Sequence, residues 1–358
     1  MLFTALSNSP LKLSNRIVMA PMTRSRAVEN NTPNALMAEY YSQRATAGLI
    51  ITEGTSPSPN GLGYARIPGL FNEAQVKGWK LVTDAVHAKG GKIFVQLMHT
   101  GRVSHSANLP AGAQVEAPTA DVCPGEMYTD AQGMKPHSTP RAMLADEIAR
   151  CVSEFVKSAQ FAVEAGFDGV ELHAANGYLI EQFLNANVNK REDAYGGSIE
   201  GRNRFALEVA RATVAAIGAH RVGIRLSPYG VLNATGKFAD VEQQYLELTQ
   251  ELSSIGLAYI HVLDHSAMGT PPVPGEFKSA LRKSFKGTFI LAGGFNKDSA
   301  EAALASGQAD LVAFGRPYIA NPDLVDRLQA NAELNNLDMA TFYTPGPKGY
   351  TDYPVLTN

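Results

Sequence analysis

The stretch GVELHAANGYL, residues 169–179, joins a short apolar run to a cluster of polar side chains. Its first half has the composition of a buried strand, and His173, Asn176 and Tyr178 follow within six positions. One interpretation is purely structural: Asn-Gly favours a turn, Asn is a good N-cap for a helix starting near Tyr178, and His173 is an ordinary buried histidine. The other is that an imidazole, an amide and a phenol meet at a strand end to do chemistry.

Other apolar segments of this length occur along the chain, and each is too short for a helix. Most are rich in Val, Ile or Phe, and their continuous apolarity predicts strands buried on both faces, as in a parallel sheet. The predicted strands are RIVMA (16–20), LIIT (49–52), KIFVQL (92–97), GVELH (169–173), VGIRL (222–226), YIHVL (259–263), TFILA (288–292) and DLVAF (310–314).

Longer amphipathic segments lie between these strands and predict helices. Several end in glycine, which suits the position after a helix where φ is positive. The helical segments span residues 33–48, 72–90, 146–166, 199–218, 240–256 and 297–307. Strands that alternate with helices in this way predict an α/β fold, a (β/α)8 TIM barrel. A doubly wound open sheet is the alternative, but it would more usually show G-x-G-x-x-G after an early strand, and this chain has none.

The domain organisation is expected to be simple. No interdomain linker or low-complexity segment interrupts the sequence, so residues 1–358 are predicted to form a single domain. The stretch from about 100 to 145 is rich in Pro and Gly and long for a loop after a barrel strand. Because long loops in compact domains are often functional, it is predicted to be a capping subdomain after the third strand.

Charge and cysteine content exclude several classes of protein. The formal net charge is −3 and no long basic run exists, which argues against nucleic acid or an anionic membrane surface as a partner. Cys123 and Cys151 have neither the number nor the spacing for a disulfide framework or a zinc site. The first residues lack a basic region followed by a long apolar stretch, so no signal peptide is expected, and no apolar run approaches the roughly 20 residues of a membrane span. A cytoplasmic protein is expected.

A barrel places catalytic side chains at the carboxyl ends of its strands. Polar residues or glycines stand at each predicted end, namely Pro21-Met22-Thr23-Arg24, Glu53-Gly54, Gln96 with Met98-His99-Thr100-Gly101-Arg102, then His173, Asn176 and Tyr178, Arg225, Asp264-His265, Gly293-Gly294 and Gly315-Arg316. AGGF and FGRP follow the last two strands, where barrels often hold a phosphate between flexible loops. The structural explanation is that these glycines only make tight turns.

Arg225 is unusual because an arginine inside a packed strand is costly unless it has a partner. It is expected either to pair with a carboxylate such as Glu53 or Asp264, or to face an electron-rich ring. With Thr23 and Gln96 it could bind the edge of a heterocycle. No close carboxylate pair, H-E-x-x-H motif or strand-end lysine points to glycoside hydrolysis, metal binding or Schiff-base chemistry.

Several longer stretches are distinctive: NRIVMAPMTRSRA, QLMHTGR, AGFDGVELHAANGYLIEQFL, NKREDAYGGSIEGRNRF, LAGGF, VAFGRPYIANPDL and GYTDYP. In sequence and order they resemble the old yellow enzyme family of FMN-dependent ene-reductases, and most nearly its bacterial N-ethylmaleimide and xenobiotic reductases. The resemblance implies a TIM barrel with tightly bound, non-covalent FMN. The FMN would be reduced by NADPH or NADH and would then reduce activated C=C bonds of α,β-unsaturated carbonyls, maleimides and nitro compounds.

The resemblance also implies which residues hold FMN. Thr23 would hydrogen-bond the flavin carbonyl near N5, while Gln96 and Arg225 would bind the pyrimidine edge. Arg225 would stabilise negative charge near N1 of the reduced ring. The other implied contacts are Pro21 and Gly54 against the ring, Gly294, Gly315 and Arg316 at the phosphate, and Phe342 beside the flavin.

The same resemblance assigns the opening stretch a catalytic role. His173 and Asn176 would donate hydrogen bonds to the substrate oxygen, and Tyr178 would protonate the carbon next to the carbonyl. A phenol pKa of about 10 keeps that proton in place at neutral pH. Tyr64, Met98 and Tyr343 are expected to line the substrate cavity. The expected ligands are small activated alkenes, nitro compounds and phenolic inhibitors, bound by a monomer or homodimer.

Some positions depart from the family pattern. Many close relatives have Trp where Met98 stands, and a smaller side chain should widen that side of the cavity. Gly54 replaces a commoner Ala, some relatives have a second His at Asn176, and Gly201 is expected to be structural. Two other functions are compatible with the motifs. One is a flavin-free isomerase or aldolase that binds a sugar phosphate, and the other is a flavin-binding sensor or storage protein.

Overall fold

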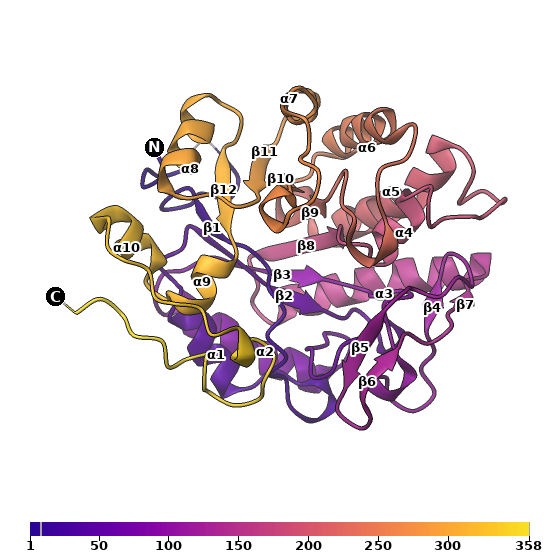
Figure 1. The fold of residues 1–358 in the computed structure, drawn as a ribbon, viewed down its shortest axis with the longest axis horizontal. Helices are drawn as coiled ribbons and strands as arrows, with labels where there is room; N and C mark the ends of the chain where they lie inside the picture. The colour runs from indigo at the N-terminus through magenta and orange to yellow at the C-terminus, as the bar shows by residue number, and fades with distance from the viewer. Residues whose placement is uncertain (8, 358) are drawn as a thin grey trace.

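A closed barrel of parallel strands forms the centre of the protein (Figure 1). The computed structural model describes residues 1–7 and 9–357. The barrel strands are β1 (Ile17–Met19), β2 (Leu49–Thr55), β3 (Ile93–Leu97), β8 (Gly169–Ala174), β9 (Val222–Leu226), β10 (Tyr259–Leu263), β11 (Thr288–Ala292) and β12 (Leu311–Phe314). They are ordered β1-β12-β11-β10-β9-β8-β3-β2 around the barrel. The predicted strands and the predicted barrel are confirmed, and the doubly wound alternative is wrong.

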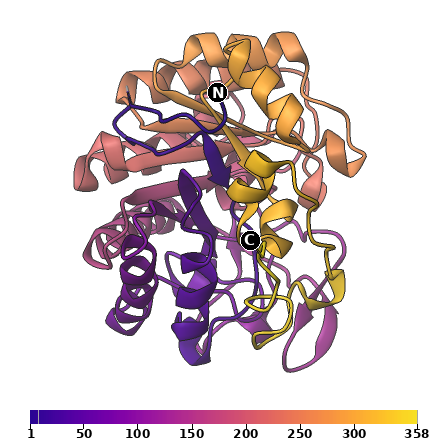
Figure 2. The same cartoon turned by 90° about the vertical axis from the view of Figure 1, so that its left-hand side faces the viewer.

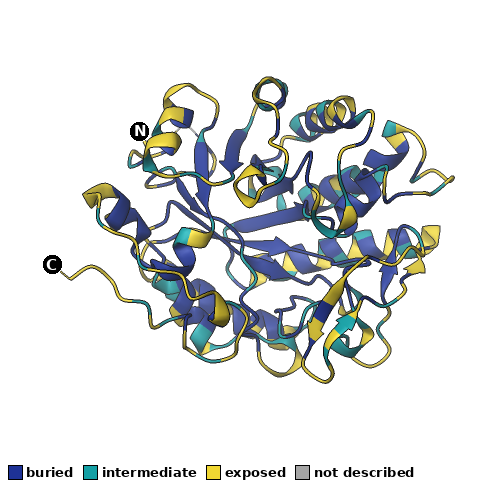
Figure 3. Cartoon of the chain, viewed as in Figure 1, coloured by how far each residue is buried: buried dark blue, intermediate teal, exposed yellow. Residues whose placement is uncertain are grey.

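Helices surround the barrel, with buried inner faces and exposed outer faces (Figures 2 and 3). They are α1 (Ala35–Ser42), α2 (Glu73–His87), α3 (Ala145–Glu164), α4 (Leu179–Leu184), α5 (Ile199–Ile217), α6 (Val241–Ile255), α7 (Gly275–Ser284), α8 (Lys297–Ala305), α9 (Arg316–Ala320) and α10 (Leu324–Ala330). Each predicted helical segment contains a helix, and α4 begins beside Tyr178, as the structural interpretation of that stretch suggested; α7, α9 and α10 were not predicted. Among the described residues, no helix is both long and apolar enough to cross a membrane.

The glycines that close most of the predicted helices behave as expected. Gly90, Gly166 and Gly256, for example, have φ of 76°, 90° and 83°. Gly48 is different, because α1 already ends at Ser42 and Gly48 does not have a positive φ. A Cβ at Gly48 would lie 2.3 Å from the carbonyl oxygen of Asn15, so this glycine is needed for close backbone approach.

Between β3 and α3 the chain leaves the barrel, as predicted. This excursion contains two small sheets, made from β4 (Glu116–Ala117) with β7 (Arg141–Ala142) and from β5 (Glu126–Thr129) with β6 (Gly133–Pro136). Arg66 connects the β5–β6 hairpin to the C-terminal segment, because it pairs with Asp130 and donates to the carbonyl of Tyr343 over 2.9 Å. The hairpin and the C-terminal segment therefore meet through one arginine.

The strand register determines which side chains meet inside the barrel. His173 of β8 is aligned with Arg225 of β9, which is aligned in turn with His261 of β10. Gln96 of β3 is aligned with Glu171 of β8. Strands β3, β8, β9 and β10 therefore bring these polar side chains together at the carboxyl half of the barrel.

Candidate active site

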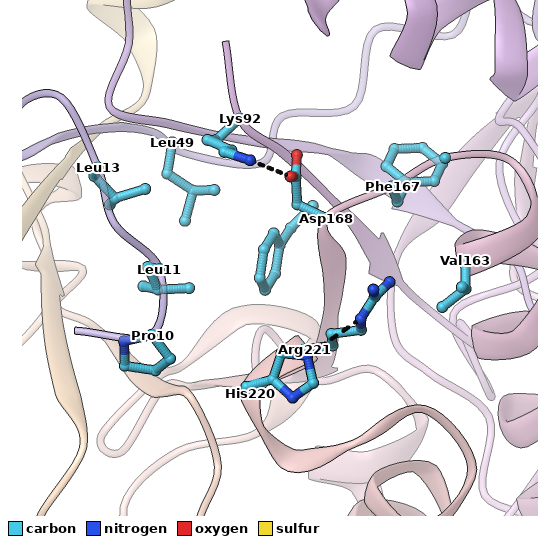
Figure 4. Close-up of a pocket in the computed structure, with 12 residues that line it drawn as sticks. Pro10, Leu11, Leu13, Leu49, Lys92, Val163, Phe167, Asp168, His220 and Arg221 are labelled. Atoms are coloured by element: carbon cyan, nitrogen blue, oxygen red, sulfur yellow. Dashed lines mark hydrogen bonds and ion pairs between the residues drawn. The ribbon is translucent and has the colours of Figure 1, made fainter. Parts of the chain in front are cut away.

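A cavity of about 710 Å³ opens at the carboxyl ends of the barrel strands. All of the predicted site residues except Tyr64 line it: Pro21, Thr23, Gly54, Gln96, Met98, His173, Asn176, Tyr178, Arg225, Gly294, Gly315, Arg316, Phe342 and Tyr343. A second cavity, of about 450 Å³, lies at the opposite ends of the strands (Figure 4). It is lined by Leu13, Phe94 and the Lys92–Asp168 ion pair among others and contains none of the predicted residues.

His173 is the last polar residue of β8 and is 3% exposed. Its Nδ1 accepts a hydrogen bond from the backbone N–H of Ala175 over 3.3 Å. Burial, followed by the positive charge of Arg225, holds the pKa of His173 well below its usual range. The imidazole is therefore neutral, with its proton on Nε2, and can donate one hydrogen bond to a ligand in the cavity.

Asn176 adopts a left-handed backbone conformation, with φ of 59°. Its N–H donates to Ser227 Oγ over 2.9 Å, and its carbonyl accepts from Asn233 Nδ2 over 2.7 Å. Its side-chain Oδ1 lies 2.9 Å from Nε2 of His265, which must donate because Oδ1 can only accept. These contacts leave the Nδ2 hydrogens of Asn176 for a ligand.

The prediction that Asn176 is the N-cap of a helix is wrong. The N-cap of α4 is Tyr178, and Asn176 does not cap the helix. The turn is made by Asn176 and Gly177 together, since Gly177 has φ of 74°. Glu181 of α4 supports this turn by accepting from the N–H of Gly177 over 2.6 Å and from Ser227 Oγ over 3.0 Å. The sequence places His265 at a strand end but does not reveal its contact with Asn176.

Tyr178 lies beside His173, with ring centroids 4.9 Å apart and nearly perpendicular planes. Its hydroxyl is 3.0 Å from the hydroxyl of Tyr64. Burial raises the pKa of Tyr178 to about 12, against the ordinary value expected from the sequence, and a hydrogen bond from Tyr64 opposes that rise. Tyr178 is thus a protonated phenol, and Tyr64 contacts its hydroxyl without being one of the residues that line the cavity.

Arg225 does not pair with either carboxylate suggested by the sequence. Glu53 accepts from the N–H of Arg24 and from Tyr41, and Asp264 pairs with Lys278. Arg225 is 5% exposed, and its Nε has no hydrogen-bond partner among the described residues. An unpartnered buried guanidinium at a cavity wall indicates a polar or anionic ligand.

Two further buried residues, Glu171 and His261, lie beside Arg225 and were not predicted. Gln96 Nε2 donates to Glu171 Oε1 over 2.8 Å, and Nδ1 of His261 lies 2.8 Å from Glu171 Oε2. The Glu171 and His261 side chains are fully buried and do not line the cavity. Their only signal in the sequence is a carboxylate within GVELH and an imidazole within YIHVL, both inside buried strands.

Met98 and Gly54 are packed against each other on neighbouring strands. A Cβ at Gly54 would lie 2.5 Å from Met98 Sδ, so the small residue at position 54 accommodates the thioether. Met98 is 1% exposed and packs on Leu62 and Ile67. Since Met98 also lines the cavity, a larger side chain at this position is expected to extend into it. Gly201 is structural as expected, since a Cβ there would lie 2.2 Å from the carbonyl oxygen of Gly196.

The loops after β11 and β12 lie side by side, because Ala292 and Ala313 are aligned at the ends of these strands. Gly293 and Gly294 have φ of 138° and 67°, which fits the conformational freedom expected of them. Gly315 precedes α9, and a Cβ built on it would have no atom closer than 3.8 Å, so the backbone there is open to the cavity.

Comparisons with known proteins agree with this geometry. Residues 1–335 match the model of the NADH:flavin oxidoreductase / NADH oxidase family. The chain is 44% identical to 12-oxophytodienoate reductase 1 of Oryza sativa subsp. japonica, over 99% of this chain and 93% of that protein. The structure of morphinone reductase superimposes with a TM-score of 0.95 at 46% identity, covering 99% of this chain and 96% of that one.

The old yellow enzyme homologue of Zymomonas mobilis also has a TM-score of 0.95, at 42% identity and with 99% of both chains covered. The family match spans most of the chain, and the identities lie far above the level at which only the fold is shared. These comparisons agree with the resemblance seen in the sequence motifs. The protein is a member of the NADH:flavin oxidoreductase / NADH oxidase family, an NAD(P)H-dependent FMN oxidoreductase of the old yellow enzyme type.

Proposed function

We propose that this enzyme is an ene-reductase that reduces activated C=C bonds of α,β-unsaturated carbonyls, maleimides and nitro compounds. The observation that carries the proposal is the end of β8. Two neutral N–H donors, His173 and Asn176, and a protonated phenol, Tyr178, line the same cavity there. Such donors are suited to polarising an unsaturated carbonyl, and such an acid is suited to protonating the neighbouring carbon.

The cavity fits FMN in its chemistry. Among the described residues, the Nε of Arg225 has no hydrogen-bond partner, and Gln96 donates its Nε2 to Glu171 while lining the cavity. Both would hold the pyrimidine edge, with Thr23 near N5 and Pro21, Gly54 and Phe342 around the ring. Gly294, Gly315 and Arg316 would hold the phosphate. When bound, FMN supplies the transfer of a hydride from NADPH or NADH to the alkene.

His173 and Asn176 would donate to the substrate oxygen. Each donor is fixed before the substrate arrives: His173 by the N–H of Ala175, and Asn176 by His265, Ser227 and Asn233. Preorganised donors of this kind contribute about 3–4 kcal/mol where negative charge develops in the transition state. The same pair would bind phenolate oxygens, which explains why phenols should inhibit.

Tyr178 would donate the proton to the carbon next to the carbonyl. Its raised pKa of about 12 means that the phenol is protonated across the physiological range. Tyr64 would support the resulting tyrosinate by donating to it across the 3.0 Å contact. Tyr64 is thus proposed to assist Tyr178, whereas Met98 and Tyr343 form the walls of the substrate cavity.

Residues 1–358 are proposed to act as one FMN-binding domain, with residues 100–145 capping the barrel mouth. The Arg66 bridge between the β5–β6 hairpin and the segment that carries Tyr343 supports this arrangement. The proposed ligands are small molecules, and the proposed assembly is a monomer or homodimer.

An anaerobic stopped-flow experiment on the purified holoenzyme tests the function. Either NADPH or NADH should bleach the absorbance of oxidised flavin, and 2-cyclohexenone should restore it with formation of cyclohexanone. Bleaching without restoration by enones, maleimides or nitroalkenes would contradict the ene-reductase proposal and favour a flavin-binding sensor. The steady-state rate should match the slower of the two half-reactions.

Met98→Trp should narrow the substrate range. Met98 is enclosed by Leu62, Ile67 and Gly54, so an indole at this position must extend into the cavity. The ratio of rates on bulky and small 3-substituted cyclohexenones should fall by about tenfold or more, as expected for a steric clash of about 1–3 kcal/mol. Met98→Leu, of similar volume, is the matched control. An unchanged ratio in Met98→Trp would show that Met98 does not limit the cavity.

A further inference from the structure

The carboxylate of Glu171 is buried directly behind the two side chains that are proposed to hold the flavin edge. One oxygen accepts from Gln96 Nε2 and the other from His261 Nδ1, each over 2.8 Å. The Glu171 side chain is fully buried, and so is His261. A charged carboxylate at such a depth is costly unless it is paired and hydrogen-bonded, so its position calls for an explanation.

Arg225 supplies the charge that balances Glu171. No ion pair within 4.0 Å joins them in the described residues, but their opposite charges interact, and Arg225 is the neighbour of both His173 and His261 in the barrel register. His261 is a neutral donor, because burial lowers its pKa. The buried cluster therefore contains one carboxylate, one guanidinium and a neutral imidazole.

We propose that Glu171, held in place by His261, is a positioning residue that lowers the redox potential of the bound FMN. It does so in two ways, by fixing the Gln96 amide with Oε1 toward the cavity and by offsetting part of the positive charge that Arg225 presents. Glu171 does not line the cavity and so acts only through these two side chains. The inference rests on the proposed flavin-facing role of Gln96 and Arg225.

The sign of the effect follows from charge balance. Reduction of FMN by two electrons with uptake of one proton (FMN + 2e⁻ + H⁺ → FMNH⁻) adds one negative charge. Arg225 favours this charge and Glu171 opposes it. Removing the Glu171 charge should therefore favour the reduced state. A single nearby charge shifts a charge-forming equilibrium in a buried site by about tenfold or more.

Glu171→Gln in the holoenzyme tests this inference. Its FMN midpoint potential, measured anaerobically against a reference dye, should become more positive by about 30 mV or more, which is a tenfold change for a two-electron couple. Glu171→Asp keeps the charge and should shift the potential by less than half as much. Glu116→Gln is the matched control, because Glu116 is equally buried and ion-paired with Arg150 but does not line the cavity or contact Gln96.

Each remaining outcome is decisive. An unchanged or more negative potential in Glu171→Gln would overturn the inference, as would equal shifts in Glu171→Gln and Glu171→Asp. Loss of FMN from both variants would also overturn it, by showing that Glu171 serves only folding. If Glu171→Gln alone loses FMN, oxidised and reduced FMN are titrated separately into the variant and into the wild type. The preference for reduced over oxidised FMN should then be about tenfold greater in the variant. The potential is measured without an enone, so an unchanged potential would not contradict the proposed alkene reduction. Likewise, a failure to reduce enones would not contradict the proposed role of Glu171.

Discussion

Tyr178→Phe should separate the two halves of the catalytic cycle. Flavin reduction by NADPH or NADH requires no proton from Tyr178 and should stay within a few-fold of wild type. Flavin reoxidation by 2-cyclohexenone requires one, and general acid catalysis is typically worth about 10²–10⁴-fold, so this step should slow by that factor. Stopped-flow absorbance at the flavin band measures each half separately.

The surroundings of Tyr178 make this variant informative. Phe fills the same volume beside His173 and removes only the hydroxyl that contacts Tyr64. Tyr64→Phe is the matched control: it leaves the Tyr178 proton in place and should slow reoxidation far less. Nitroalkenes should also suffer less, because the nitronate formed from them is stable and can be protonated later by water. Reoxidation of Tyr178→Phe by cyclohexenone at the wild-type rate would assign the proton to another donor.

Arg225→Ala should lose FMN and stability together. The variant removes the buried guanidinium proposed to bind the flavin edge and also removes a positive charge that helps to keep the Glu171 carboxylate ionised. Because the two side chains form no ion pair among the described residues, the loss of stability should stay below the roughly 3–5 kcal/mol that breaking a buried pair costs. FMN binding should weaken by about 10²-fold or more, corresponding to roughly 3 kcal/mol. Flavin retention on gel filtration and denaturant unfolding measure the two effects.

The double variant Arg225→Ala with Glu171→Gln separates these effects. With both charges removed, the free energy of unfolding should recover by about half of the loss or more, because no buried charge is left unpaired. FMN binding should not recover, since no cation remains at the pyrimidine edge of the flavin. Full flavin occupancy and an unchanged flavin spectrum in Arg225→Ala would contradict the proposed contact.

The sequence predicts the barrel strands well because each is a short, continuously apolar segment. Such a segment is too short for a helix and must be buried on both faces, as a strand of a parallel barrel is. Short helices are predicted less well. Each residue of α4, LIEQFL, is buried, so no polar face marks it. Helix α7, GEFKSALRKS, has only 10 residues, buries Phe277 and Leu281 alone, and begins at a Pro-Gly pair that suggests a loop.

The candidate site could be predicted as a set of strand ends but not as a network. Tyr64 and Tyr178 are 114 positions apart, and His265 meets Asn176 across 89 positions, so only the fold reveals these contacts. The sequence marks Arg225 as unusual within its strand, but it does not reveal the nearby buried charge of Glu171. The sequence suggests carboxylates at strand ends, whereas Glu171 lies within β8, where only the barrel register shows its position.

The fate of deuterium in the product tests the central claim most directly. NADPH or NADH that carries deuterium at the transferred position should place this deuterium on the β carbon of 2-cyclohexenone. With unlabelled nicotinamide in D₂O, the deuterium should instead appear at the α carbon, because Tyr178 passes on a proton that exchanges with solvent. The overall reaction is enone + NAD(P)H + H⁺ → saturated ketone + NAD(P)⁺. Nicotinamide-derived deuterium at the α carbon, at the carbonyl carbon of an alcohol, or nowhere in the product would contradict hydride addition to the alkene.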